Sequence, residues 1–232
     1  MNRVAIIPAR AGSKRIKQKN IKFFCGKEMI AWSIEAAIKS GCFDRIIVST
    51  DDEKIAKVAN KYGIEAPFVR PAELSDDFST TSEVIAHSIK WLNDNEVKPD
   101  LVCCIYATAP FIQSTDIVKG LDLLIKKHCE FVFPVTSFPF PIQRAIKLKE
   151  DGSVKMFQPE NYLVRSQDLT PAFHDAGQFY WGDAESWVQQ KSIFSNSRAF
   201  PLILPSYRVQ DIDNIEDWER AEIMHKTINS GK

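Results

Sequence analysis

The sequence predicts an α/β protein with a mostly parallel β-sheet, and two observations carry that prediction. Short apolar, β-rich runs alternate with stretches of helical periodicity over the first two thirds of the chain. Strands that alternate with helices in this way are typical of βαβ units, whose strands run parallel. A length of 232 residues is enough for one large domain. We therefore expect residues 1–232 to form a single domain.

The first elements follow directly from local patterns. The apolar run that ends at Pro8 predicts the first strand. Ile30, Ile34 and Ile38 then recur every four residues, which is the spacing of one face of a helix. Gly41 lies where the end of that helix is expected. Later strands are expected at residues 45–49, 66–69, 101–106, 131–135, 178–181 and 200–204.

A second helix is predicted to start at Thr80-Thr81-Ser82-Glu83. A hydroxyl residue followed three positions later by glutamate is the pattern of a capping box. The apolar side chains that follow continue one helix face. Further helices are expected around residues 55–63, 114–124, 183–189 and 215–228.

The pattern changes over residues 137–175, which contain several prolines and the turn dipeptide Asp151-Gly152. That dipeptide separates two short β-type runs at 146–148 and 154–156, so a hairpin is expected there. We interpret the segment as an excursion from the domain that serves as a lid or a dimerisation arm. Phe138, Phe140 and Phe157 would be exposed on it, and exposed apolar patches often mark interfaces, so we expect a homodimer.

Composition excludes several classes of protein. Thirty Lys and Arg balance thirty Asp and Glu, so the net charge is zero and general attraction to nucleic acid or to anionic lipid is not expected. No apolar run approaches the length of a membrane span. The apolar run near the N-terminus is too short for a signal-peptide core, so we expect a cytoplasmic location.

The segment from Pro8 to Arg15, with Lys19-Asn20 beyond it, is the most informative motif. It follows the first strand directly, and ligands bind at the carboxyl ends of strands in open α/β sheets. Its small residues allow close backbone approach to an anion, and it carries several cations. It matches neither the Walker A pattern nor GxGxxG. The alternative is a solvated basic loop.

Two further segments follow predicted strands. Residues 49–52 (STDD) fit a ligand site or an N-cap for the next helix about equally well. Residues 106–110 (YATAP) place small residues at a strand end, which fits either a ligand lying across it or a simple turn.

The pair Asp211 and Asp213 stands at positions i and i+2 of a segment without strong helical character. Side chains at this spacing in an extended segment point the same way, so two carboxylates can share one hard cation such as Mg²⁺. The alternative is a turn with an N-cap before the last helix. Among the histidines only His174, which precedes Asp175, is a site candidate. The cationic loop and the carboxylate pair point to nucleotide or phosphoryl chemistry. The absence of HExxH and GxSxG argues against a metalloprotease and an α/β hydrolase.

The segments IIPARAGSKRIKQKNI, IIVSTDD, RPAEL and QDIDNIEDW together resemble the acylneuraminate cytidylyltransferases, the CMP–sialic acid synthetase family. Within that family, FPFPIQRA and HDAGQFYWG are most similar to the pseudaminic acid branch. The resemblance implies a Rossmann-like three-layer nucleotidyltransferase fold. It also implies an enzyme that uses Mg²⁺ to transfer CMP from CTP to the anomeric hydroxyl of a nonulosonic acid, a nine-carbon 2-keto sugar acid, with release of pyrophosphate.

The same resemblance assigns roles to individual residues. Arg10 and Lys19 would hold the CTP phosphates, and Asp211 and Asp213 would bind Mg²⁺; these form the expected catalytic set. The expected nucleotide-binding set is Pro8, Ala9, Arg10, Gly12, Ser13, Lys14, Lys19, Asn20 and Ser82. The expected sugar-binding set is Tyr106, Thr108, Arg144, Arg165, His174, Asp175, Gln178 and Phe179.

Some roles stay open on sequence alone. Arg144 and Arg165 are candidate partners of the sugar carboxylate, because arginine reads carboxylates with two parallel hydrogen bonds. Either could instead be a surface or dimer-interface residue. The proton of the attacking hydroxyl could be lost with the help of the metal, or to His174 or Asp175.

One departure from the family bears on the substrate. Members that act on sialic acid usually read LQPTSPL where this chain reads IYATAPF, so Tyr106 replaces a glutamine. This argues against N-acetylneuraminic acid as the substrate, and the likeness of FPFPIQRA and HDAGQFYWG to the pseudaminic acid branch favours pseudaminic acid. The alternatives are a CMP–sialic or CMP–legionaminic acid synthetase, a CMP–Kdo synthetase, and a nucleotide-binding protein without catalysis.

Overall fold

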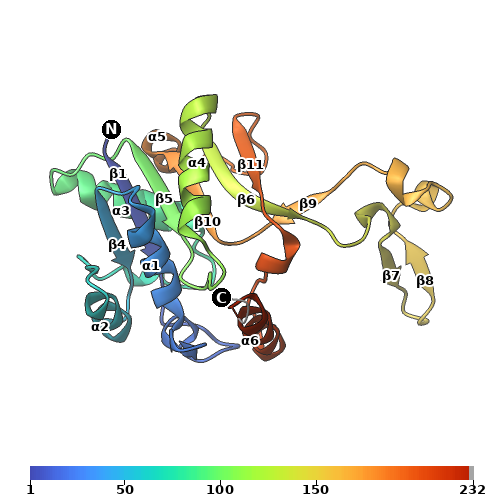
Figure 1. Ribbon diagram of the computed structural model, residues 1–232, viewed down its shortest axis with the longest axis horizontal. Helices are drawn as coiled ribbons and strands as arrows, with labels where there is room; N and C mark the ends of the chain where they lie inside the picture. The colour runs from blue at the N-terminus through green and yellow to red at the C-terminus, as the bar shows by residue number, and fades with distance from the viewer. Residues whose placement is uncertain (230–232) are drawn as a thin grey trace.

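A computed structural model describes residues 1–229, and within them seven strands form one central sheet (Figure 1). The strand order is β11-β6-β10-β5-β1-β4, and β9 pairs with β6. Neighbours β4, β1 and β5 run parallel, as do β11 and β6, while β10 and β9 run antiparallel to their neighbours. The predicted, mostly parallel α/β sheet is therefore confirmed. The strands are β1 (Arg3–Pro8), β4 (Arg45–Ser49), β5 (Leu101–Ile105), β6 (Phe131–Ser137), β9 (Phe173–Asp175), β10 (Phe179–Asp183) and β11 (Ala199–Ile203).

Helices cover both faces of the sheet, which makes three layers. Alternate side chains of β1 enter opposite cores: Ile7 packs with Ile34 of α1, and Ile6 packs with Ile85 of α3. One core also contains residues of α2 and α4, and the other contains Trp187 of α5. Figure 1 shows α1 and α4 together in front of the strands. The helices are α1 (Met29–Ser40), α2 (Glu53–Lys61), α3 (Thr81–Asp94), α4 (Ser114–Lys127), α5 (Ala184–Val188) and α6 (Ile215–Asn229).

The helix boundaries have the local causes that the sequence predicts. Gly41 ends α1 in the left-handed region, with φ of 63°, where glycine carries no steric penalty. Thr80 and Glu83 form the reciprocal capping box at the start of α3. The strand predicted at 66–69 is wrong, because only isolated bridges form at Glu65 and Val69. Pro67 lies between these two bridges and has no backbone N–H to donate to a neighbouring strand.

A short hairpin and the last helix, α6, lie near the motif at residues 8–20. The hairpin strands are β2 (Phe23–Phe24) and β3 (Lys27–Glu28). Phe24 and Trp218 of α6 lie in a third buried cluster, with ring centroids 5.2 Å apart. Among the described residues, no helix is both long enough and apolar enough to cross a lipid bilayer. Short 3₁₀ turns lie at Lys19–Ile21, Ala72–Leu74, Ile142–Arg144, Pro159–Asn161, Ser166–Asp168 and Ser206–Arg208.

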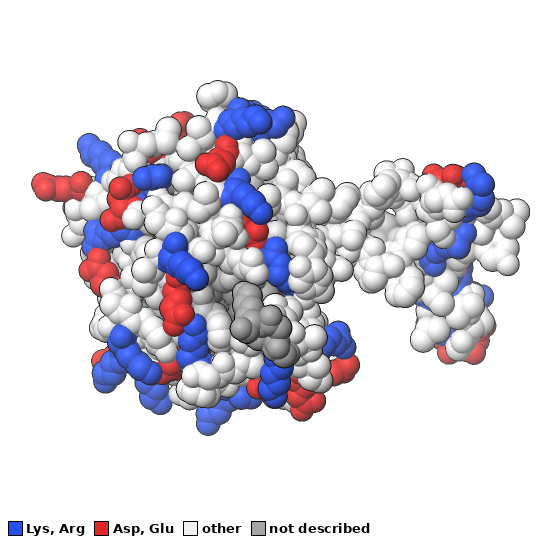
Figure 2. All heavy atoms as spheres, in the orientation of Figure 1, with Lys and Arg blue, Asp and Glu red and all other residues white. Residues whose placement is uncertain are grey.

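Residues 138–172 form an arm that projects far from the body, and the arm ends in the predicted hairpin of β7 (Ile146–Leu148) and β8 (Val154–Met156) (Figure 1). The arm leaves the sheet along the end of β6 and returns as β9, which pairs beside it. Many apolar side chains of the arm are exposed, with Leu163 at 87% and Phe140 at 79%. Figure 2 shows a narrow neck between the arm and the body.

The antiparallel strand β10 is packed tightly around Gly182. A Cβ atom at this position would lie 2.5 Å from the indole nitrogen of Trp187 and 2.7 Å from the ring of Phe131. Both side chains are fully buried, so neither can move away cheaply. We expect Gly182→Ala to lower the free energy of unfolding by about 1–3 kcal/mol in urea titrations, as overpacking does. Glu185→Ala, at an exposed position of the adjacent α5, is the control; equal stability of the two variants would contradict this view.

Candidate active site

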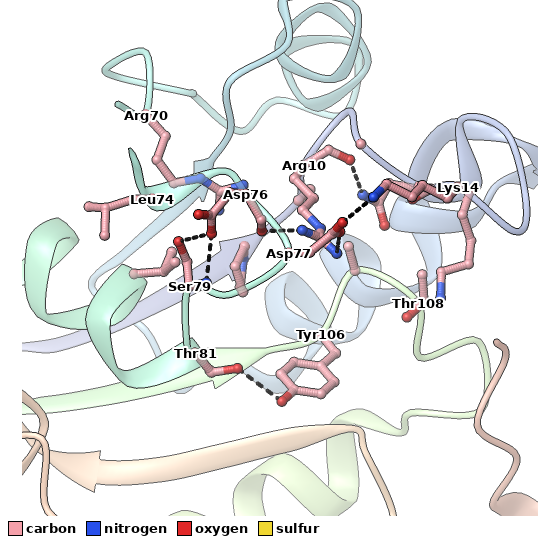
Figure 3. Close-up of a pocket in the computed structure, with 18 of the residues that line it drawn as sticks. Arg10, Lys14, Arg70, Leu74, Asp76, Asp77, Ser79, Thr81, Tyr106 and Thr108 are labelled. Carbon is pink, nitrogen blue, oxygen red and sulfur yellow. Dashed lines mark hydrogen bonds and ion pairs between the residues drawn. The ribbon is translucent and has the colours of Figure 1, made fainter. Parts of the chain in front are cut away.

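A cavity of about 450 Å³ opens where β1 and β5 end (Figure 3). Because β4, β1 and β5 run parallel, their carboxyl ends meet at one edge of the sheet. The volume is in the range of small-molecule sites. The cavity brings together most of the expected nucleotide-binding residues and several others. Its lining includes Pro8, Ala9, Arg10, Gly12, Ser13, Lys14, Arg15, Lys19, Asn20, Arg70, Asp76, Asp77, Thr80, Thr81, Tyr106, Thr108 and Asp213.

The loop after β1 is held in shape from both sides. Asp51 accepts a hydrogen bond from the backbone N–H of Ala11 (3.0 Å). The buried side-chain amide of Asn20 donates to the carbonyl oxygen of Arg10 (2.9 Å). Asp52 instead caps α2, where its carboxylate accepts a backbone N–H at 2.6 Å. The STDD segment therefore serves as both a helix cap and a support for the loop.

Cations of this loop are paired with aspartates. Arg10 and Lys14 both point to the carboxylate of Asp77, and the Arg10 distance is 3.0 Å (Figure 3). Ion pairing with Lys14 and then Arg10 holds the pKa of Asp77 below its usual value. Arg15 pairs with Asp213 at 3.1 Å. These cations can pair with a polyphosphate where its oxygens displace the aspartates.

Lys19 is the least exposed cation of the loop and joins it to the segment before α6. Its ammonium group donates to the carbonyl oxygen of Ile212 (2.6 Å) and lies 3.8 Å from the carboxylate of Asp213. Its side chain is 20% exposed, against 65% for Arg15. Burial lowers the pKa of Lys19, although the charges of Asp213 and Asp211 oppose that shift. A charge that is this poorly solvated acts strongly on an anion placed beside it.

The expected metal-binding pair flanks a fully buried residue. Ile212 is 0% exposed and belongs to the third core cluster, which leaves Asp211 and Asp213 on either side of an anchored point. Asp213 lines the first cavity, whereas Asp211 lies outside both cavities and is exposed. Partial desolvation raises the pKa of Asp211, and the charge of Asp213 raises it further. The helix cap is made by other residues, because the side chain of Asn214 accepts the N–H of Asp217 at 3.0 Å. The two carboxylates are thus not used as caps of α6.

A buried ion pair fixes the chain just before this segment. The guanidinium of Arg208 lies 2.7 Å from the carboxylate of Asp116 at the start of α4, and both side chains are at most 10% exposed. Gln178, which is also buried, donates its side-chain amide to the carbonyl oxygen of Arg208 (2.9 Å). Because a buried charge needs a partner, this pair fixes the path of residues 208–213 toward the cavity.

A second cavity, of about 370 Å³, adjoins the first one. The two share Thr80, Thr81 and Tyr106, and the hydroxyls of Thr81 and Tyr106 are 3.1 Å apart (Figure 3). Beside Tyr106 lies Tyr180, whose hydroxyl donates to Asp175; the ring centroids are 5.2 Å apart. Burial raises the pKa of both tyrosines, so they act as neutral hydroxyls. The remaining lining residues are Ser82, Gln190, Lys191, Ser192, Ile193 and Phe194.

Five expected sugar-binding residues line neither of these cavities. Phe179 is fully buried and packs in the core with α4, and Gln178 holds Arg208 as described. His174 turns its Nδ1 to the carbonyl oxygen of Asp175 (2.9 Å). Arg144 and Arg165 lie on the arm, where they bond a carbonyl oxygen and a nearby aspartate. Ser82, expected near the nucleotide, lines the second cavity.

Comparison with known proteins decides the family. A family model described as cytidylyltransferase matches residues 4–222. The chain belongs to the cytidylyltransferase family. It is 46% identical over 227 residues to a pseudaminic acid cytidylyltransferase of Campylobacter jejuni, with 97% of each chain covered. It is 32% identical over 231 residues to a CMP-N,N'-diacetyllegionaminic acid synthase of Legionella pneumophila, with 96% of this chain and 95% of the relative covered.

The fold has a solved counterpart. A structure of CMP:2-keto-3-deoxy-manno-octonic acid synthetase complexed with CTP aligns with a TM-score of 0.71 at 15% identity. The alignment covers 98% of this chain and 100% of the other. The nucleotidyltransferase fold and the family that the motifs predict are therefore confirmed. As a cytidylyltransferase, the protein is a nucleotidyltransferase enzyme.

Several cavity residues of this cytidylyltransferase have no clear local signal. Arg70 lies in RPAEL and Tyr180 lies in HDAGQFYWG, so the quoted motifs contained them without singling them out. Asp77 follows RPAEL closely, but only the fold brings it to the loop cations. The segment 190–194 reads as an ordinary loop after a helix, and no residue pattern in it points to a cavity wall.

Proposed function

We propose that this cytidylyltransferase transfers CMP from CTP to the anomeric hydroxyl of pseudaminic acid and releases pyrophosphate. The observation that carries the proposal is the pair of adjoining cavities that meet at Tyr106 and Thr81. One is rich in cations and suits a triphosphate, while the other presents hydroxyls, a carboxylate and aromatic rings that suit a sugar. Likeness along nearly the whole chain to a pseudaminic acid cytidylyltransferase supports the choice of sugar.

In this proposal the loop cations hold the triphosphate and stabilise its transition state. Negative charge grows on the bridging and leaving oxygens as the sugar hydroxyl attacks the α-phosphorus. Arg10 and Lys19 lie on the loop that lines the cavity, so both are in place to stabilise that charge. Binding of the phosphates requires Arg10 and Lys14 to exchange the carboxylate of Asp77 for phosphate oxygens.

The sugar acid would occupy the second cavity. Tyr106, just after β5, lines both cavities, whereas Thr108, also expected to bind the sugar, lines only the first one. Of the two candidates for a general base, Asp175 lines the second cavity and His174 does not. Asp175 is therefore the group in place to accept the proton of the attacking hydroxyl, while Tyr180 orients its carboxylate.

The donor set at Asp211 and Asp213 fits Mg²⁺. Both groups offer carboxylate oxygens, and Mg²⁺ with nucleotides is usually held by one or two carboxylates together with phosphate oxygens and water. Within residues 1–229 no cluster of three or more His, Cys, Asp or Glu suited to a metal is present. When bound, Mg²⁺ would supply positive charge at the reacting phosphate. The chain's part is to fix the carboxylates, through Ile212 and Lys19.

The reaction is tested by pyrophosphate release from CTP and Mg²⁺ with pseudaminic, N-acetylneuraminic, legionaminic and Kdo acids in parallel. We expect release with pseudaminic acid and little with the others, because Tyr106 alters the junction of the two cavities. Release with a different acid would keep the reaction and overturn the sugar. CTP binding without release for any acid would favour a protein without this activity.

The metal proposal is tested with Asp211→Ala. We expect turnover to fall about 10²-fold or more, as it does when other electrostatic stabilisers are removed. Glu216→Ala removes an exposed carboxylate a few residues away, 81% exposed, and should keep full activity. Near-normal turnover of Asp211→Ala at saturating Mg²⁺ would refute the assignment.

We further propose that the arm builds a homodimer. Its apolar side chains are exposed, and those of Phe140, Leu148 and Leu163 are at least 75% accessible. Since Arg144 and Arg165 line neither cavity of their own chain, any contact with a sugar carboxylate would come from a partner's arm. Light scattering should give twice the mass of the chain, and removal of the hairpin should give the monomer. A monomeric intact chain would contradict this.

The cytoplasmic location stays a prediction.

A further inference from the structure

The loop between α5 and β11 forms one wall of the second cavity. Residues 190–194 line it, and the chain then continues without regular structure to residue 198. Gln190 opens the loop in the left-handed region, with φ of 51°. A non-glycine residue in that region is uncommon, so the surrounding contacts must hold the loop in this shape.

The side chain of Glu130 holds the 190–198 loop in place from outside the second cavity. It directly precedes β6, and its side chain is only 11% exposed. One carboxylate oxygen accepts from Lys191 (2.8 Å) and Arg198 (3.3 Å), and the other accepts from the amide of Asn196 (2.7 Å). The backbone N–H of Glu130 also donates to the carbonyl oxygen of Arg198 (2.8 Å). A single carboxylate thus binds both ends of the loop.

These contacts keep the carboxylate charged and make it hard to replace. Hydrogen bonds from Lys191 and then Asn196 hold the pKa of Glu130 below its usual value. Removal of the charge would leave Lys191 and Arg198 close together without their shared counter-charge. Because hydrogen bonds to charged groups are stronger than neutral ones, loss of this group would loosen the loop.

The same loop is connected to the sugar side of the cavity through aromatic rings. Phe194 packs on Phe133 with ring centroids 5.2 Å apart, and Phe133 stacks on Tyr180 at 6.1 Å. Tyr180 in turn lies beside Tyr106. Phe194 is 66% exposed, so this contact alone holds the loop weakly. Glu130 therefore supplies the polar anchor that the wall needs.

We propose that Glu130 is a positioning residue for the sugar acid: through Lys191, Asn196 and Arg198 it fixes the 190–198 loop as a wall of the second cavity. It touches neither cavity itself. The proposal rests on the proposed function, because it assigns the second cavity to the sugar acid. A change at Glu130 should therefore affect binding of the sugar acid and not binding of CTP, because the anchored loop does not line the first cavity.

The kinetic test compares Glu130→Gln with Glu185→Gln. Glutamine keeps the size of glutamate but removes its charge, and Glu185 is an exposed carboxylate of the neighbouring α5 that also accepts a side-chain hydrogen bond (2.8 Å). We expect Glu130→Gln to raise KM for the sugar acid about tenfold and to leave KM for CTP within about twofold, since a misplaced wall weakens the bound geometry. Glu185→Gln should match the wild type. An unchanged KM for the sugar acid, or an equal rise in KM for CTP, would overturn the proposal.

A second readout separates this proposal from the proposed function. Hydrogen exchange in residues 190–198 should become faster in Glu130→Gln, while exchange in α3 stays as in the wild type. This measurement needs no substrate, so it holds even if the wild type releases no pyrophosphate with any sugar acid. Unchanged exchange in the loop would overturn the positioning role. If Glu130→Gln does not fold, Asn196→Ala removes one of the three donors and should give the same shifts at smaller size.

Discussion

The hydrogen bond from Lys19 to the carbonyl oxygen of Ile212 ties together two segments that lie almost the whole chain apart. One segment is the cationic loop after β1, and the other carries Asp211 and Asp213. Burial of Ile212 in the third core cluster fixes the acceptor, and partial burial of Lys19 makes the bond costly to exchange for water. The proposed phosphate and metal sites are therefore parts of one assembly.

The sequence predicts well whatever depends on neighbouring residues. The capping box at Thr80, the helix stop at Gly41 and the Asp151-Gly152 hairpin all form as expected, because each is decided within a few positions. The loop after β1 is predictable for the same reason, since its small and cationic residues are contiguous. The strand predicted at 66–69 does not form, whereas β6 and β11 form around Pro134 and Pro201, so an apolar run with a proline does not by itself decide whether a strand forms.

Features that depend on distant parts of the chain are not visible in the sequence. The direction of β10, which runs antiparallel between β5 and β6, cannot be read from its apolar residues. Phe179 and Gln178 look like site residues, yet one fills the core and the other holds Arg208. The partners of the loop cations, such as Asp77, and the cavity wall anchored by Glu130 emerge only when the chain is folded.

The coupling between Lys19 and the segment that carries Asp213 can be measured most directly with a double-mutant cycle. CTP affinity would be determined by calorimetry in the presence of Mg²⁺ for the wild type, Lys19→Met, Asp213→Asn and the double variant. Because Lys19 contacts the segment that carries Asp213, we expect the two losses not to add, with a coupling energy above about 0.5 kcal/mol. Lys17→Met, at an exposed position outside the cavity, should bind CTP like the wild type. Strictly additive losses would show that the two segments act separately and would contradict the single assembly.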